Sequence, residues 1–139
     1  MRQLIRWFER EGPDLPWRRT RDRWAILVSE VMLQATPVAR VIPYYEAWMA
    51  RWPTPQSLAG APLGDAISAW QGLGYPRRAR NLHAAATVLS QSGWPEPHRY
   101  HDLPGVGDYT AAAIRCFADE APVLPEDVNV RRVVARRFP

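Results

Sequence analysis

The sequence predicts an all-α domain of about seven or eight short helices. Apolar residues recur with a helical period in every ordered segment, and no segment alternates as a strand does. Clusters of proline and glycine separate these segments at short intervals. With 139 residues, of which 47% are hydrophobic, the chain has the size and balance of one globular domain with its own core.

Four helices are predicted in the first half of the chain, and turn-forming residues mark their ends. The first helix is amphipathic and stops at Gly12-Pro13. The third begins at Thr36-Pro37, because threonine is a capping residue and proline fits the first helical position, and it ends at Pro53 and Pro55. The predicted segments are Arg2 to Glu11, Arg23 to Gln34, Thr36-Pro37 through Met49, and Leu63 to Trp70.

Three further helices are predicted in the second half. The loop Gly72 to Pro76 comes before the first of them, and the loop Ser92 to Pro97 follows it. The predicted helices are the segment that carries Leu82, Ala85, Ala86 and Leu89, then Asp108 to Ala118, and finally Asp127 to Arg137. We therefore interpret residues 1–139 as one domain.

Charge and composition narrow the class of protein. The net charge is +4, and all 18 basic residues are arginine. Arginine clusters at 18–23, 77–80 and 131–137 would attract a polyanion, although solvated helices often carry such charge. The lone cysteine, Cys116, excludes an internal disulfide and favours a reducing compartment. With no secretory signal and no membrane-spanning run, we expect a soluble, cytoplasmic protein that has no membrane partner.

The hairpin Leu103 to Gly107 is the strongest functional signal. Its Gly105-Val106-Gly107 turn leads into a helix, so that backbone N–H groups point outward beside a positive helix end. This arrangement suits a phosphate. The hairpin predicts a site for a nucleic acid backbone.

Glu30 is a candidate general acid. The helix around it, Ile26 to Leu33, is apolar on nearly all sides, so burial would raise the pKa of its carboxyl. A general acid at neutral pH requires such a shift. The alternative is a structural glutamate paired with one of the many arginines.

Asp127 is a candidate second acid. It precedes the helical pattern Val128 to Arg137, where its side chain would cap the free N–H groups, and capping alone would explain it. A carboxylate held in this way would also face a developing cation. One protonated and one charged carboxyl flanking the bond between a sugar and its leaving group is the usual arrangement for glycoside cleavage.

Tyr75 has two interpretations, because a tyrosine between Gly74 and Pro76 is either a core aromatic or an exposed wedge. An exposed wedge holds a flipped nucleotide out of the base stack. The histidines show no metal-ligand spacing, so no side-chain metal site is predicted.

Several motifs in the same order resemble the adenine DNA glycosylases of the MutY type, within the helix-hairpin-helix superfamily that includes endonuclease III. The resemblance covers essentially the whole chain and implies an N-terminal helix plus a six-helix core. The motifs are Leu15-Pro16-Trp17-Arg18, Ser29-Glu30-Val31-Met32-Leu33-Gln34, Val41-Ile42-Pro43-Tyr44, Gly72-Leu73-Gly74-Tyr75, Arg78-Ala79-Arg80-Asn81-Leu82, Leu103-Pro104-Gly105-Val106-Gly107 and Asp127-Val128-Asn129-Val130.

The resemblance implies removal of adenine mispaired with 8-oxoguanine or guanine in double-stranded DNA. Glu30 would protonate the adenine and Asp127 would stabilise the sugar cation, supported by Tyr109 and Asn129. The residues implied to line the base pocket are Trp17, Arg18 and Leu33. The residues implied to bind DNA are Gln34, Leu73, Tyr75, Leu103, Gly105, Val106 and Gly107, with the hairpin carbonyls as candidate ligands of a monovalent cation. By the same resemblance, Leu73 and Tyr75 match the loop that probes the strand opposite the target base. The protein implied is a monomer that is nucleoid-associated when bound to DNA.

Tyr109 also bears on the mechanism. Relatives that cut the strand carry at this position a lysine that forms a Schiff base with the sugar. Because this chain has tyrosine there and no lysine at all, we predict a monofunctional glycosylase. A thymine glycosylase acting on G:T mismatches has a compatible tyrosine and stays an alternative, as does a non-catalytic helix-hairpin-helix module that only binds DNA.

The chain departs from the family pattern at several positions. Gln34-Ala35 stands where two glutamines are usual, Pro76 replaces an aromatic residue, and Pro125-Glu126 replaces an apolar pair. The four-cysteine iron-sulfur segment and the C-terminal domain that recognises 8-oxoguanine lie outside residues 1–139, and a cluster is expected only in a full-length form. We expect a fragment or partial gene whose activity at this length is weak or absent.

Overall fold

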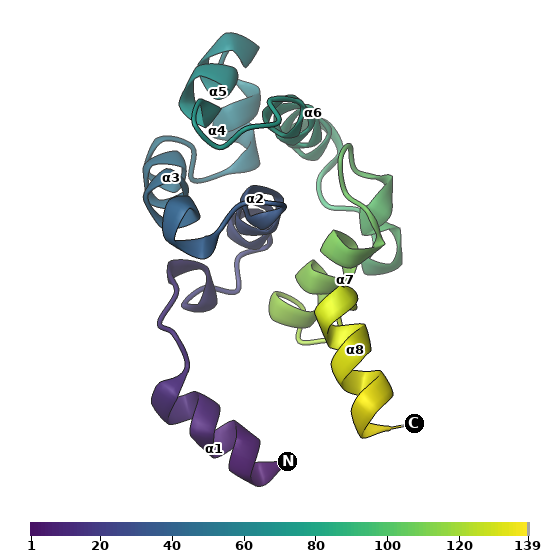
Figure 1. The fold of residues 1–139 in the computed structure, drawn as a ribbon. Helices are drawn as coiled ribbons and strands as arrows, with labels where there is room; N and C mark the ends of the chain where they lie inside the picture. The colour runs from purple at the N-terminus through teal and green to yellow at the C-terminus, as the bar shows by residue number, and fades with distance from the viewer. Residues whose placement is uncertain (139) are drawn as a thin grey trace.

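The computed structural model describes residues 1–138. Every regular element among them is helical, as the helical period of the apolar residues predicted (Figure 1). All seven predicted helices are present, with ends within a few residues of the predictions. The α-helices are α1 (Arg2–Glu11), α2 (Arg23–Leu33), α3 (Val38–Arg51), α4 (Pro55–Ala59), α5 (Leu63–Trp70), α6 (Arg77–Ser92), α7 (Asp108–Phe117) and α8 (Val128–Arg137). Two short 3₁₀ helices are η1 (Pro16–Arg18) and η2 (Pro97–Asp102).

Helix α2 is the centre of the fold. Its residues 24–32 are all buried, and it packs against α3, α6, α7 and η1 (Figure 1). Burial on every side follows from a sequence that is apolar around the whole helix rather than along one stripe. Asp22 caps its N-terminus by accepting a hydrogen bond from the Ala25 N–H.

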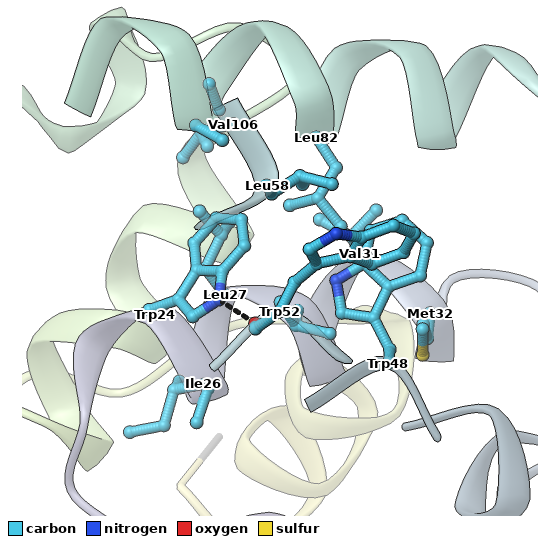
Figure 2. Close-up of a cluster of buried hydrophobic side chains, with 14 of the residues drawn as sticks. Trp24, Ile26, Leu27, Val31, Met32, Trp48, Trp52, Leu58, Leu82 and Val106 are labelled. Carbon is cyan, nitrogen blue, oxygen red and sulfur yellow. Dashed lines mark hydrogen bonds between the residues drawn. The ribbon is translucent and has the colours of Figure 1, made fainter. Parts of the chain in front are cut away.

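Tryptophan dominates the core beside α2. The Trp24 indole N–H donates to the Trp52 carbonyl at 3.0 Å, which satisfies a polar group that burial would otherwise leave unpaired (Figure 2). Trp48 packs edge-on against Trp52 and Trp70, with ring centroids 4.7 and 5.6 Å apart. These rings join α2, α3 and α5 into one apolar cluster.

The structure corrects two turn assignments. Helix α3 ends at Arg51, and Pro55 is the first residue of α4 rather than only a terminator, because proline fits the first turn of a helix. Thr54 caps α4 in a reciprocal capping box with Ser57. Thr36 does not cap α3: the N-cap residue is Pro37, and the buried Thr36 hydroxyl accepts a hydrogen bond from Arg78 at 3.2 Å.

Helices α1 and α8 form the two ends of the described chain and contribute no buried residue (Figure 1). The apolar face of α1 stays exposed, with Trp7 at 52% and Phe8 at 56% of full exposure. Within residues 1–138, no helix is both long and apolar enough to cross a membrane.

Candidate active site

Glu30 lies in the middle of α2 and is only 4% exposed. Burial raises the pKa of its carboxyl, and the positive charge of Arg18 opposes this shift in part. Among residues 1–138, no ion pair involves Glu30, so the paired structural glutamate of the alternative interpretation is not formed. The carboxyl is therefore an acid that keeps its proton to a higher pH than a surface glutamate does.

Asp127 caps α8, as its position in the sequence predicted. Its Oδ1 accepts a hydrogen bond from the Val130 N–H at 2.7 Å. The unsatisfied N–H groups and the dipole at this helix end favour a negative charge. Unlike Glu30, Asp127 is exposed, so its carboxyl lies at the surface.

Tyr109, in the first turn of α7, connects these two acids. Burial raises the pKa of its phenol, the nearby charges of Glu30 and Asp127 raise it further, and Arg18 lowers it. The phenol therefore lies within electrostatic reach of both carboxyls, which come from opposite ends of the sequence. Its 39% exposure leaves one side of the ring accessible. Glu30, Tyr109, Asp127 and Arg18 together form what we call the acid cluster.

The predicted base-pocket residues occupy three different environments. Arg18, at the end of η1, is exposed and stacks its guanidinium 3.9 Å from the Phe117 ring centroid. Trp17 is 1% exposed, and its ring packs edge-on against Tyr45 at 5.4 Å. Leu33 is half-buried at the end of α2. Arg18 belongs to the acid cluster, whereas Trp17 belongs to the core.

Asn129 lies in the first turn of α8 and is exposed. It follows Asp127 by two residues, so the same loop and helix start place both side chains. Its predicted role in positioning the reacting nucleotide remains a prediction.

The hairpin Leu103 to Gly107 is anchored to the hydrophobic core by two buried side chains. Leu103 and Val106 are 3% and 6% exposed, so any contact of this hairpin with a ligand would be made through its backbone. Gly105 has φ +76°, and a Cβ there would lie 2.7 Å from the Cβ of Asn81. Glycine is therefore required by both the backbone conformation and the close approach to α6. Gly107 is the N-cap residue of α7.

The two predicted DNA contacts in the loop before α6, Leu73 and Tyr75, differ in exposure. Tyr75 is 69% exposed with φ +51°, so the structure resolves its two interpretations in favour of an exposed aromatic. Leu73 is 4% exposed and packs into the core, so a direct side-chain contact with the opposite strand is not available in this conformation. The difference in exposure arises because the apolar Leu73 side chain is buried in the hydrophobic core.

Gln34 joins this loop at the end of α2. Its amide lies 3.4 Å from the Thr110 hydroxyl, a long contact that links α2 to α7. A surface pocket brings the exposed Gln34 and Tyr75 together, lined by Gln34, Ala35, Tyr75, Arg77, Arg78 and Asn81. The two segments, far apart in the sequence, thus form one surface.

Arg78 was missed by the sequence interpretation, which placed it in a solvated basic cluster. The structure buries it, with its guanidinium surrounded by main-chain oxygens. No local signal distinguishes it from Arg77 and Arg80, which stay exposed on the same helix.

Metal ligands are scarce in the described part of the chain. No group of three or more His, Cys, Asp or Glu residues within 1–138 is arranged to hold a metal ion. His83 lies 2.8 Å from the Ala61 carbonyl, a contact that fixes its ring between α6 and the end of α4. One cysteine cannot supply the four thiolates of an iron-sulfur cluster, so the residues present do not fit that cofactor.

Comparison with known proteins gives the family. The family model of HhH-GPD superfamily base excision DNA repair proteins matches residues 28–139. The chain belongs to this superfamily. The helical fold and the glycine hairpin before α7 agree with that membership.

Curated relatives within this superfamily are named adenine DNA glycosylases. The one from Mycolicibacterium smegmatis is 48% identical over 139 residues, covering 96% of this chain and 47% of the relative. The one from Homo sapiens is 44% identical over 146 residues, covering 96% of this chain and 27% of the relative. The chain thus spans about half the length of its bacterial relatives or less.

Solved structures show the same fold. A thermostable thymine-DNA glycosylase superposes with a TM-score of 0.86 at 28% identity, over 96% of this chain and 64% of that one. A non-covalent endonuclease III–DNA complex gives 0.77 at 22% identity, over 96% and 67%. The second likeness establishes the HhH-GPD fold alone.

Proposed function

We propose that this chain is the glycosylase domain of an adenine DNA glycosylase, which hydrolyses the N-glycosidic bond of adenine mispaired with 8-oxoguanine or guanine. The observation that carries the proposal is the acid cluster, in which the buried Glu30 carboxyl and the exposed Asp127 carboxyl both raise the pKa of the Tyr109 phenol. Cleavage through a sugar cation requires a proton donor on one side of the glycosidic bond and a carboxylate on the other. The names of the curated relatives support adenine as the base.

In the proposed reaction Glu30 acts first. Its carboxyl donates a proton to a ring nitrogen of the extruded adenine, and the electron pair of the glycosidic bond leaves with the base. Because burial raises the pKa of Glu30, its carboxyl keeps the proton to a higher pH than an exposed glutamate does. The departing base is then neutral adenine rather than an anion.

Asp127 acts on the sugar. Its carboxylate, held by the Val130 N–H, faces the positive charge that develops as the glycosidic bond breaks. Water then attacks the sugar carbon, and its proton passes to the ionised Glu30, which restores the starting state. The products are free adenine and an abasic site in an intact strand.

Strand cleavage requires an amine that this chain does not place at the sugar. Tyr109 occupies the first turn of α7 beside both acids, and the sequence contains no lysine. A phenol cannot form a Schiff base, so the reaction stops at the abasic site. We therefore propose a monofunctional enzyme.

The DNA contacts proposed for the domain surround the acid cluster. The backbone N–H groups of the Gly105 to Gly107 turn and the start of α7 suit a phosphate. The exposed ring of Tyr75 suits insertion between bases, which would hold the nucleotide out of the stack. Arginines on α6 and α8 add general attraction to the DNA backbone.

A base-release assay tests the proposal. Enzyme in excess is mixed with a duplex that carries adenine opposite 8-oxoguanine, and alkali then cleaves the abasic sites formed. We expect slow release that Glu30→Gln abolishes while binding to the duplex persists. Glu46→Gln, an exposed acid on α3, is the matched control and should leave the rate unchanged. Release that survives Glu30→Gln would exclude the mechanism.

A second candidate function is removal of thymine from G:T mismatches. The observation that favours it is the TM-score of 0.86 to a thymine-DNA glycosylase at 28% identity. A duplex panel with adenine or thymine as the target base separates the two. Binding without release of either base would instead identify a DNA-binding module.

A further inference from the structure

Arg78 is the most heavily hydrogen-bonded side chain in the described chain. Its guanidinium reaches two segments that are distant in the sequence, the end of α2 and the loop before α6. Toward α2, Nη1 donates to the carbonyls of Val31 at 2.9 Å, Met32 at 3.3 Å and Gln34. Toward the loop before α6, Nη2 donates to the carbonyls of Leu73 at 3.0 Å and Gly74 at 3.2 Å. Nη2 also donates at 3.2 Å to the hydroxyl of Thr36, which follows α2.

Two of these acceptors are next to residues in an uncommon backbone conformation. Ala35 and Tyr75 have φ +56° and +51°, in the left-handed region that side chains with a Cβ disfavour. The carbonyl of Gln34 precedes Ala35, and the carbonyl of Gly74 precedes Tyr75. One guanidinium therefore holds the peptide that leads into each left-handed residue.

The surroundings of Arg78 contain no counter-charge. Within residues 1–138 no ion pair involves its guanidinium, and its Nε has no hydrogen-bond partner. The rings of Trp70 and Tyr75 lie 5.3 and 5.6 Å from it. Burying a charge is costly unless carbonyl dipoles and aromatic faces replace water, so this arrangement is specific to an arginine fork.

We infer that Arg78 is a positioning residue, which sets the placement of Gln34-Ala35 relative to Tyr75 on the surface that faces the DNA strand opposite the target base. This inference rests on the proposed function, because the two loops line one pocket at the surface proposed to meet DNA. Arg78 is itself 9% exposed, so it acts through the loops rather than by touching DNA.

The first experiment needs no DNA. Hydrogen exchange, followed by mass spectrometry, compares the wild-type chain with Arg78→Met in peptides that cover 33–37 and 72–76. We expect exchange in both peptides to rise about tenfold or more, because the fork that joins them is lost. Leu89→Ala, at the other end of α6 and buried, is the control for general loss of stability. A rise in only one peptide, or an equal rise in the control, would contradict the inference.

The second experiment separates positioning from folding. Binding and single-turnover base release are measured for duplexes that carry 8-oxoguanine, guanine or cytosine opposite adenine. Arg78→Met should weaken the preference among opposite bases about tenfold, since a displaced loop misplaces its contacts, while release at saturating enzyme changes little. Arg78→Lys keeps the charge without the planar fork and should fall between the two.

Arg80→Met is the matched charge control, because Arg80 is exposed on the same helix. It should weaken binding to all duplexes equally, as expected for a phosphate contact. An Arg78→Met variant that keeps the full opposite-base preference would overturn the inference. If the wild-type chain neither binds a duplex nor releases a base from one, the proposed function fails, and the exchange experiment still decides whether Arg78 joins the two loops.

Discussion

Helix α2 has a buried ionisable group at its centre and another against its carboxyl end, and the two are treated in opposite ways. Glu30 has no ion-pair partner among the described residues, and burial raises the pKa of its carboxyl. Arg78 donates to six oxygen acceptors and stays a cation even though burial lowers its pKa. Burial without a hydrogen-bonding or ion-pair partner within residues 1–138 favours the protonated form of Glu30. Burial with six acceptors lets Arg78 link the end of α2 to the loop before α6.

This contrast indicates different roles for the centre and the carboxyl end of α2. The centre of α2 offers a neutral acid to the acid cluster, where chemistry is proposed. The carboxyl end is fixed against the loop before α6, where recognition of the opposite strand is proposed. Removing the first group should therefore affect rate, and removing the second should affect stability and selectivity.

Glu30→Gln should have the largest effect. Loss of a general acid lowers the single-turnover rate of base release by about 10² to 10⁴-fold. Folding should be little affected, because the amide matches the carboxyl in size and adds no charge to desolvate at this buried position. Rate measurements beside thermal unfolding check both parts. Strong destabilisation would mean that Glu30 is structural, and the contrast with Arg78 would then be lost.

Asp127→Asn should separate capping from catalysis. Asparagine caps helices about as well as aspartate does, so α8 should keep its stability within about 0.5 kcal/mol. The negative charge that faces the sugar cation is lost, and base release should fall by at least about tenfold. Circular dichroism and the release assay measure the two effects. Glu126→Gln, in the same loop, should change neither.

Arg78→Met should destabilise the fold by about 2 to 4 kcal/mol, because several buried carbonyls lose their donor at once. Urea denaturation measures this loss of unfolding free energy. The comparison with Glu30→Gln is direct, since both substitutions replace a buried ionisable group beside α2. Equal stability of the two variants would show that the carbonyl contacts of Arg78 contribute little.

The pH dependence of stability should reveal the proton on Glu30. Burial raises its folded-state pKa above the ordinary value of 4.5, so above that value the folded state binds more protons than the unfolded chain. The contribution of Glu30 to stability is therefore largest below pH 4.5 and is lost as pH rises through its raised folded-state pKa. Unfolding curves of the wild type and Glu30→Gln across pH isolate this term. A difference between them that is independent of pH would refute the shift.

Tyr75→Gly should have the smallest effect on stability. Glycine adopts φ +51° without penalty, so relief of strain offsets the lost packing, and unfolding free energy should stay within about 1 kcal/mol. Affinity for a mispaired duplex should nevertheless fall, because the exposed ring is gone. Calorimetry and fluorescence anisotropy measure the two. Unchanged affinity would remove Tyr75 from the proposed DNA surface.

Local sequence determined the helices and two of the key acids. Periodic apolar residues fix a helix wherever they recur, and the uniformly apolar segment around Glu30 was enough to predict its burial. The cap at Asp127 is likewise a contact between residues three apart. The short α4 escaped prediction, because a five-residue helix carries no full apolar period.

Only the tertiary structure decided which side chains meet. Packing of α2 against α7 brings Glu30 near Tyr109, and the charge of Asp127 also raises the pKa of the Tyr109 phenol. Arg78 is buried, and its neighbours Arg77 and Arg80 are not, because its helix face meets the end of α2. A sequence pattern records the polarity of each residue, whereas burial of a polar group depends on partners that distant segments supply.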